Sequence, residues 1–169
     1  MAGQQTLRTI SVIATSLVGC AAVAEPEQDF SGAYFCTAEA AGGVRFNDST
    51  ERWQGTRFTA DTKRIITIER GGKVLDVVPE SLDYYYVTYK YHGEDIDLGC
   101  VDVSDTLSEF PQLIHINDGE ISCKTYGGWL EVNLRNGRFL QTSTAGYTDG
   151  IDNNRNTPAV VIGTCSRIR

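Results

Sequence analysis

Aromatic side chains that suit a binding surface are concentrated in one short segment of the sequence. Residues 84–91 hold five tyrosines, and the alternation of side chains along an extended strand places Tyr85 and Tyr89 on the same face. Tyr and Trp combine an apolar ring with a polar group, which suits ligand and partner surfaces. Together with Trp53 and Trp129, these two tyrosines are candidates for lining a pocket. The alternative is a structural role, because Tyr is also a good strand former.

The sequence contains no residue pattern that is typical of a catalytic site. It has two histidines, and we expect His92 in a turn and His115 on a strand. A pairing of either histidine with Ser104 or Ser122 lacks a supporting motif such as G-x-S-x-G. The sequence therefore favours a protein that is not an enzyme.

Oxygen-bearing side chains recur at regular spacing near the C-terminus. Asp152, Asn154 and Asn156 reproduce the 1, 3, 5 ligand spacing of a calcium loop. Thr157 and Gly163, however, stand where such a loop has its Gly and its bidentate Glu. Asp and Asn are also common in turns, because their side chains bond to nearby backbone. A calcium site and an ordinary turn are both open, and no cofactor is predicted.

The most acidic stretch of the chain lies between residues 94 and 109. Its carboxylates could act as an acid–base pair, as in a hydrolase, or could attract a basic partner. They could also form a solvated strand face and loop. The residues are Glu94, Asp95, Asp97, Asp102, Asp105 and Glu109.

The first 24 residues have the order of a secretory signal. A single charged residue, Arg8, precedes a modest apolar stretch at residues 10–18, and small residues follow. The stretch is shorter than the ~20 residues of a membrane-spanning helix. Cleavage is expected after Ala24, or before Cys20 if the segment ending there is a lipobox that leaves Cys20 lipidated. Both alternatives predict export to the periplasm, as a soluble or a lipid-anchored protein.

The mature protein is expected to be one acidic domain. Residues 25–29 form a short linker, and residues 30–169 form a single β domain. Loss of Arg8 with the signal changes the net charge from −7 to −8. Such a charge repels nucleic-acid phosphates and anionic membrane surfaces. The predicted partner is thus a small ligand or a basic protein, with membrane contact only through a lipid anchor.

Turn residues separate runs of alternating apolar residues, which predicts antiparallel hairpins. Gly-Gly, Asp-Gly and Asn-Gly allow the positive φ angles of tight hairpin turns. We expect further strands at residues 31–38, 53–59 and 159–167, and one helical turn at residues 106–110. The predicted hairpins pair residues 65–70 with 73–78, 84–91 with 96–103, 113–117 with 120–124, and 129–135 with 138–144, across turns at Gly71-Gly72, His92-Gly93, Asp118-Gly119 and Asn136-Gly137.

Eight to eleven short strands joined by hairpins predict an all-β antiparallel meander. A long meander tends to close into a barrel because closure removes its exposed edges. A β-sandwich is the alternative. Four cysteines follow the signal, and an even number in an exported chain indicates two disulfides rather than a metal site. Since closure puts the first strand beside the last, we favour pairing Cys36 with Cys165 and Cys100 with Cys123.

The start of the domain resembles two groups of small barrels. Residues 30–34, Phe-Ser-Gly-Ala-Tyr, are similar to the Gly-x-Trp start of lipocalins and related calycins, with Tyr34 in the Trp position. That resemblance implies an up-and-down barrel with a ligand cavity. Tyr34-Phe35-Cys36 resembles the early Tyr-x-Cys of periplasmic lysozyme inhibitors, which are disulfide-bonded barrels and often lipid-anchored. The run from Gly146 to Cys165 looks like uncharacterised exported bacterial proteins and implies no function.

Two functions are expected on these grounds. The first is a non-enzymatic barrel that binds a small or peptidic ligand in the cell envelope, through Tyr85, Tyr89, Trp53 and Trp129. The second is an interaction protein that inhibits a basic envelope-active enzyme such as lysozyme. The shape of the barrel interior discriminates between them, because the first needs a cavity of a few hundred Å³.

Overall fold

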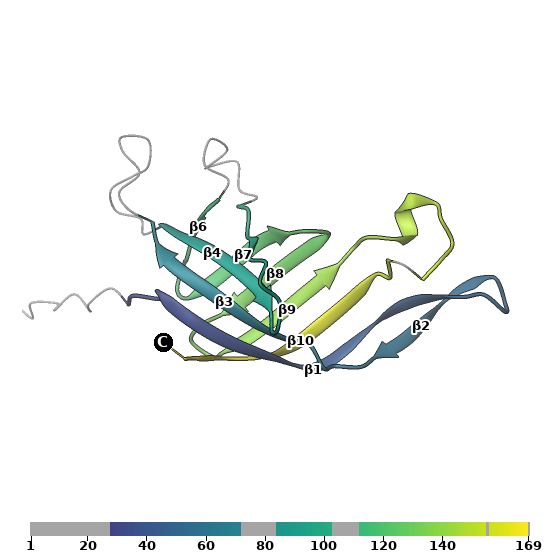
Figure 1. The fold of residues 1–169 in the computed structure, drawn as a ribbon, viewed down its shortest axis with the longest axis horizontal. Coiled ribbons are helices and arrows are strands. Elements are labelled where there is room, and N and C mark those ends of the chain that lie inside the picture. The colour runs from purple at the N-terminus through teal and green to yellow at the C-terminus, as the bar shows by residue number, and fades with distance from the viewer. Residues whose placement is uncertain (1–27, 72–83, 103–111, 155, 169) are drawn as a thin grey trace, which may run out of the picture.

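The computed structural model describes residues 28–71, 84–102, 112–154 and 156–168 (Figure 1). This part of the chain consists of strands, turns and one short 3₁₀ helix, which confirms the predicted all-β class. It contains no helix with the length and hydropathy to span a membrane. The predicted signal segment with Cys20 and the predicted helical turn at residues 106–110 lie outside the described residues.

Ten strands form one antiparallel sheet. Their order is β5-β4-β3-β1-β10-β9-β8-β7, with β2 beside β1 and β6 beside β4. Apart from β2, this is the order of an up-and-down meander. The strands are β1 (Gly32–Asn47), β2 (Arg52–Phe58), β3 (Lys63–Arg70), β4 (Tyr84–Tyr91), β5 (Leu98–Gly99), β6 (Leu113–His115), β7 (Glu120–Thr125), β8 (Gly128–Asn133), β9 (Arg138–Ser143) and β10 (Ala159–Arg167).

The first strand lies beside the last, as the closed meander requires. β1 and β10 pair from Tyr34 opposite Arg167 to Gly43 opposite Ala159. Cys36 and Cys165 are direct partners in this ladder, with Cα atoms 3.9 Å apart, and form a disulfide. The pairing predicted from the sequence is therefore present.

Short strands close the opposite side of the barrel, between β4 and β7. β6 and β5 pair with successive parts of β4. The backbones of Val101 and Lys124 then exchange two hydrogen bonds of 3.0 and 2.8 Å, which join this segment to β7. The predicted Cys100–Cys123 disulfide lies beside this bridge, with Cα atoms 5.4 Å apart. The sheet is thus nearly closed into a barrel. The presence of two disulfides indicates that the protein folds in an oxidising environment.

Two predicted hairpins are present, one with a different turn and the other with a shortened second strand. The predicted hairpin of residues 113–117 with 120–124 keeps its turn and a single bridge between Asn117 and Glu120, because β6 pairs with β4 instead of β7. Asp118 and Gly119 both have positive φ, 52° and 81°, as a two-residue type I′ turn requires. The β8–β9 turn is longer than expected, because Asn133 pairs with Arg138 and leaves residues 134–137 outside the ladder. In the hairpin after β4, the second strand is limited to β5.

The predicted hairpin at Gly71-Gly72 is wrong. β4 occupies one edge of β3 from Arg64 to Arg70, and β1 occupies the other edge from Lys63 to Ile68. Neither edge is left for residues 73–78 to pair with β3 across a tight turn. The expected strand at these residues lies outside the described part of the chain.

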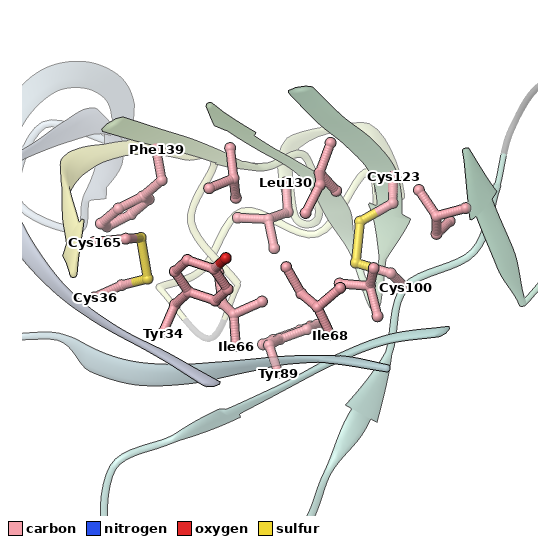
Figure 2. Packing of buried hydrophobic residues seen from close by; sticks show 14 of the residues in the cluster. Tyr34, Cys36, Ile66, Ile68, Tyr89, Cys100, Cys123, Leu130, Phe139 and Cys165 are labelled. Atoms are coloured by element: carbon pink, nitrogen blue, oxygen red, sulfur yellow. A yellow bond between two sulfur atoms is a disulfide. The ribbon is translucent and has the colours of Figure 1, made fainter. Parts of the chain in front are cut away.

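Side chains from all sides of the barrel occupy its interior (Figure 2). Alternate residues of each strand point inward, as Leu130 and Val132 do on β8 and Ile66 and Ile68 on β3. The Tyr34 hydroxyl donates a hydrogen bond of 3.0 Å to the Phe30 carbonyl, so this buried polar group has a partner. Each fully buried large apolar side chain stabilises the fold by roughly 1.5–3 kcal/mol.

One part of the sheet extends beyond the barrel. β1 is 16 residues long, and its first half pairs with β3 while its second half pairs with β2. Between Ala38 and Ala40 the register with β10 shifts, and such a bulge bends a strand. Figure 1 shows β1 and β2 projecting from the barrel, with the loop before β10 beside them. We call residues 41–58 and the loop at 144–158 the arm.

Candidate interaction surface on the arm

An aromatic cluster joins the two pieces of the arm. Phe46 on β1 and Trp53 on β2 are direct partners in the ladder, with ring centroids 5.7 Å apart. On its other side, Trp53 meets Tyr147 of the loop edge to face, at 5.5 Å and 84°. Such aromatic pairs are worth about 0.5–1.5 kcal/mol beyond the area that they bury. Trp53 therefore connects the hairpin to the loop.

The loop residues predicted as calcium ligands make hydrogen bonds to the hairpin. The Trp53 indole Nε1 donates to Asp152 Oδ1 at 2.7 Å, and the Phe46 backbone N–H donates to Asn154 Oδ1 at 3.1 Å. Asn156 is exposed. Within the described residues, no three His, Cys, Asp or Glu side chains are grouped as metal ligands would be. Protein donors thus engage two of the three candidate ligands.

Glycine at position 43 lets the loop approach the hairpin closely. A Cβ at Gly43 would lie 2.1 Å from the Pro158 carbonyl oxygen and 2.8 Å from the Cα of Ala159. The neighbouring Val44 N–H donates a hydrogen bond of 3.1 Å to the same carbonyl. The end of the loop is thus fixed against the hairpin by backbone contact as well as by side chains.

The surface of the arm combines exposed apolar side chains with charges. Tyr147 is 60% exposed and Ile151 is 61% exposed, and Trp53 beside them is partly exposed. Exposed Tyr and Trp rings are enriched at protein interfaces, where they supply much of the binding energy. The charged side chains exposed on the arm include Arg45, Asp48, Glu51, Arg52, Asp149 and Asp152. This arrangement fits a surface that binds another protein.

The structure does not bring the four predicted pocket residues together. Tyr85 and Tyr89 are buried in the barrel core, at 1% and 2% exposure, and burial raises the pKa of the Tyr89 phenol. Trp129 lies on the outer face of β8, at 39% exposure. Its neighbours Gly128 and Leu130 occupy buried positions of the strand, so the alternation turns Trp129 outward. Trp53 lies on the arm. The prediction of one pocket lined by all four is therefore wrong.

Both histidines pack against aromatic rings. The His92 ring is 5.9 Å from that of Phe35, and the His115 ring is 5.7 Å from that of Tyr84. His92 lies in a turn and His115 on β6, as predicted. Ser122 is exposed on β7, and Ser104 lies outside the described residues.

Three of the four described carboxylates of the acidic stretch are solvated, and the fourth, Asp102, is partly buried. Glu94, Asp95 and Asp97 are exposed, and Asp97 lies 3.9 Å from the Lys90 ammonium. Exposed ion pairs of this kind contribute about 0–1 kcal/mol. Asp105 and Glu109 lie outside the described residues. The exposed carboxylates are compatible both with a solvated loop and with a surface that attracts a basic partner.

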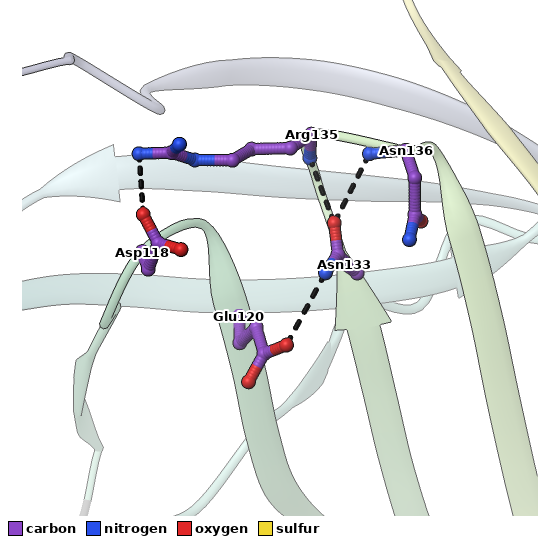
Figure 3. Close-up of polar contacts among 5 residues, drawn as sticks. All are labelled: Asp118, Glu120, Asn133, Arg135 and Asn136. Carbon is purple, nitrogen blue, oxygen red and sulfur yellow. Dashed lines mark hydrogen bonds and ion pairs between the residues drawn. The ribbon is translucent and has the colours of Figure 1, made fainter.

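A polar network joins two turns at the β6–β7 and β8–β9 ends (Figure 3). Arg135 contacts Asp118 at 2.5 Å, and the Asn133 amide donates to Glu120 at 3.2 Å. Asn133 Oδ1 also accepts the backbone N–H groups of Arg135 and Asn136. These bonds account for the long β8–β9 turn, because the Asn133 side chain replaces a backbone partner. We assign this network a structural role.

Sequence reasoning missed Tyr147 and Ile151, the two most exposed apolar residues of the arm. The sequence did contain a signal for them. Both are large apolar residues in an otherwise polar loop, where they are not needed for a buried core and therefore indicate an interaction surface. Comparisons of this chain with protein-family models, curated proteins and solved structures found no match.

Proposed function

We propose that this chain is an exported, non-enzymatic interaction protein that binds a basic enzyme of the cell envelope through the arm. The observation that carries the proposal is the exposure of Tyr147, Ile151 and Trp53 on a projection whose hairpin and loop are joined by hydrogen bonds. Rigid aromatic side chains bind with little loss of conformational entropy. Lysozyme is the test case for such an enzyme.

The packing of the barrel favours a protein partner over a ligand held deep inside it. Buried side chains from β1, β3, β4, β8 and β9 meet in the interior (Figure 2). A cavity for a drug-sized ligand needs about 300 Å³ or more, and side chains occupy the central space where it would lie. The barrel acts in this proposal as the scaffold that presents the arm.

Charge supports a basic partner. The mature chain carries a net charge of −8 if the signal containing Arg8 is removed. An acidic protein attracts a basic one over distance and raises the association rate, most strongly at low salt. Asp149 and Asp152 lie on the same loop as Tyr147 and Ile151, but the arm as a whole has four acidic and four basic residues, so the attraction comes from the net charge of the whole chain.

Export is part of the proposal. It is supported by the first 24 residues, in which a charged residue, an apolar stretch and small residues follow one another as in a secretory signal, and by the two disulfides. The mature protein is soluble in the periplasm or anchored by a lipid on Cys20. Intact-mass measurement of the mature protein distinguishes the two forms.

A lysozyme-activity assay with the purified protein tests the proposal. We expect inhibition at micromolar protein in low salt, and weaker inhibition as salt is added, because salt screens charge steering. Absence of inhibition at micromolar protein in low salt would remove lysozyme as the partner.

A further inference from the structure

Arg64 is a charged residue whose side chain lies inside the barrel. On β3 it stands opposite Cys36 of β1 and Tyr91 of β4, and it is only 1% exposed. It shares the inward face of β3 with Ile66 and Ile68. A charge in that position is unusual, because moving an ion out of water costs several kcal/mol.

The guanidinium has aromatic and amide neighbours. Its carbon lies 4.8 Å from the centre of the Phe139 ring and 5.6 Å from that of Tyr91. Its Nη1 donates a hydrogen bond to the Gln141 side-chain oxygen. Ring faces attract a cation, but they do not neutralise it as a carboxylate does.

Arg64 is incompletely satisfied in this position. Its Nε is buried and has no hydrogen-bond partner, and among the described residues no carboxylate forms an ion pair with it. Burial lowers the pKa of the guanidinium from its ordinary value. Buried polar groups without a partner are rare in folded proteins, and each calls for an explanation.

The guanidinium is close to one end of the barrel. Gln141 and Tyr91, which contact it, are both partly exposed, so side chains next to Arg64 reach solvent. β1 continues from the neighbouring Cys36 towards the arm, which places this end of the barrel at the base of the arm. The Gln141 side chain is the group that accepts a hydrogen bond from the guanidinium at this end.

We propose that Arg64 binds the carboxylate of a small organic acid at this end of the barrel. A carboxylate accepts two parallel N–H bonds from a guanidinium, so it would satisfy Nε together with a terminal nitrogen. The rings of Phe139 and Tyr91 would border the apolar body of the acid. This site is separate from the arm and does not depend on a protein partner.

Thermal unfolding with benzoate tests the site. We expect benzoate to raise the Tm progressively with concentration, whereas benzyl alcohol and sodium chloride at matched ionic strength leave it unchanged. Arg64→Gln removes the shift, and Arg138→Gln, which changes an exposed arginine on β9, retains it. An equal shift with sulfate would overturn the assignment to carboxylates, and an equal shift with chloride would overturn the site.

A measurement on the unaltered protein covers the case in which Arg64→Gln does not fold. The Nε–H signal of Arg64 in a ¹⁵N-labelled sample should move on titration with benzoate and stay in place with benzyl alcohol. The signal is assigned by elimination: each other arginine whose variant folds is substituted in turn, and the Nε–H signal that never disappears belongs to Arg64. A signal unmoved at saturating benzoate would overturn the proposal.

Discussion

The barrel and the arm are built from the same strand β1 but are stabilised in different ways. In the barrel, β1 has β3 and β10 as neighbours, and its inward side chains join a buried core fixed by two disulfides. In the arm, β2 has β1 as its one neighbour among the described strands, and side-chain hydrogen bonds and ring contacts hold the loop. We infer that the barrel carries stability and that the arm is free to carry recognition.

Removal of the Cys36–Cys165 disulfide should have the largest effect on the barrel. The bond joins residues 129 apart, and the chain-entropy model gives a loss of about 5 kcal/mol for a loop of that length. We expect the double variant Cys36→Ser/Cys165→Ser to lose this stability in urea unfolding monitored by circular dichroism. A loss below about 1 kcal/mol would contradict the assignment of this bond as the main constraint.

Removal of the Cys100–Cys123 disulfide should cost less but should open the barrel locally. The bond joins residues 23 apart, which corresponds to about 3.4 kcal/mol in the same model. One backbone bridge, between Val101 and Lys124, lies beside it, whereas a long ladder accompanies the other bond. Hydrogen exchange at those two amides should therefore increase more than exchange in β1 and β10. Uniform exchange changes would argue against a local seam.

Gly43→Ala should perturb the arm and leave the barrel intact. The new Cβ would lie 2.1 Å from the Pro158 carbonyl oxygen, so the loop must move, at a cost of about 1–3 kcal/mol for such overpacking. Gly55→Ala on β2 is the matched control, because no atom lies within 4 Å of its Cβ position. Tryptophan fluorescence should change for the first variant alone. Equal changes in both would show that the contact with the loop does not matter.

Asp152→Ala should have the smallest effect. It removes the acceptor of the Trp53 indole N–H, and a hydrogen bond at an exposed site contributes about 1 kcal/mol or less. In a Trp129→Phe background, Trp53 is the remaining tryptophan of the two in the chain, and its emission should shift to longer wavelength. Asp48→Ala, on the arm hairpin, provides the control. An unchanged spectrum would indicate that Trp53 is not held by the loop.

The closed meander could be predicted because its signals are local and consistent. Asp118-Gly119 indicated a tight turn because both residues readily adopt positive φ. The pairing of Cys36 with Cys165 could be predicted because a closed meander places the first strand beside the last. The full length of β1 was missed, because residues 40–43 are Ala-Ala-Gly-Gly and show no apolar alternation. The wrong hairpin after β3 arose because a Gly-Gly pair permits a tight turn but does not require one.

The candidate site was less predictable, because it depends on contacts between distant parts of the chain. No local pattern shows that Trp53 meets Tyr147 and Asp152, which lie far along the sequence. Two signals were nevertheless available from strand alternation. Leu130 and Val132 face inward, which already places Trp129 outside, and the register of Ile66 and Ile68 already places Arg64 inside.

Inhibition of lysozyme by matched surface variants tests the division between barrel and arm most directly. The account predicts that Tyr147→Ser/Ile151→Ser, on the arm, raises the half-inhibitory concentration about ten-fold or more, as loss of central interface residues does. Trp129→Ser, on the outer barrel wall, should match the unaltered protein, and all three should unfold at similar urea concentrations. Loss of inhibition in Trp129→Ser with retention in the arm variant would contradict the account.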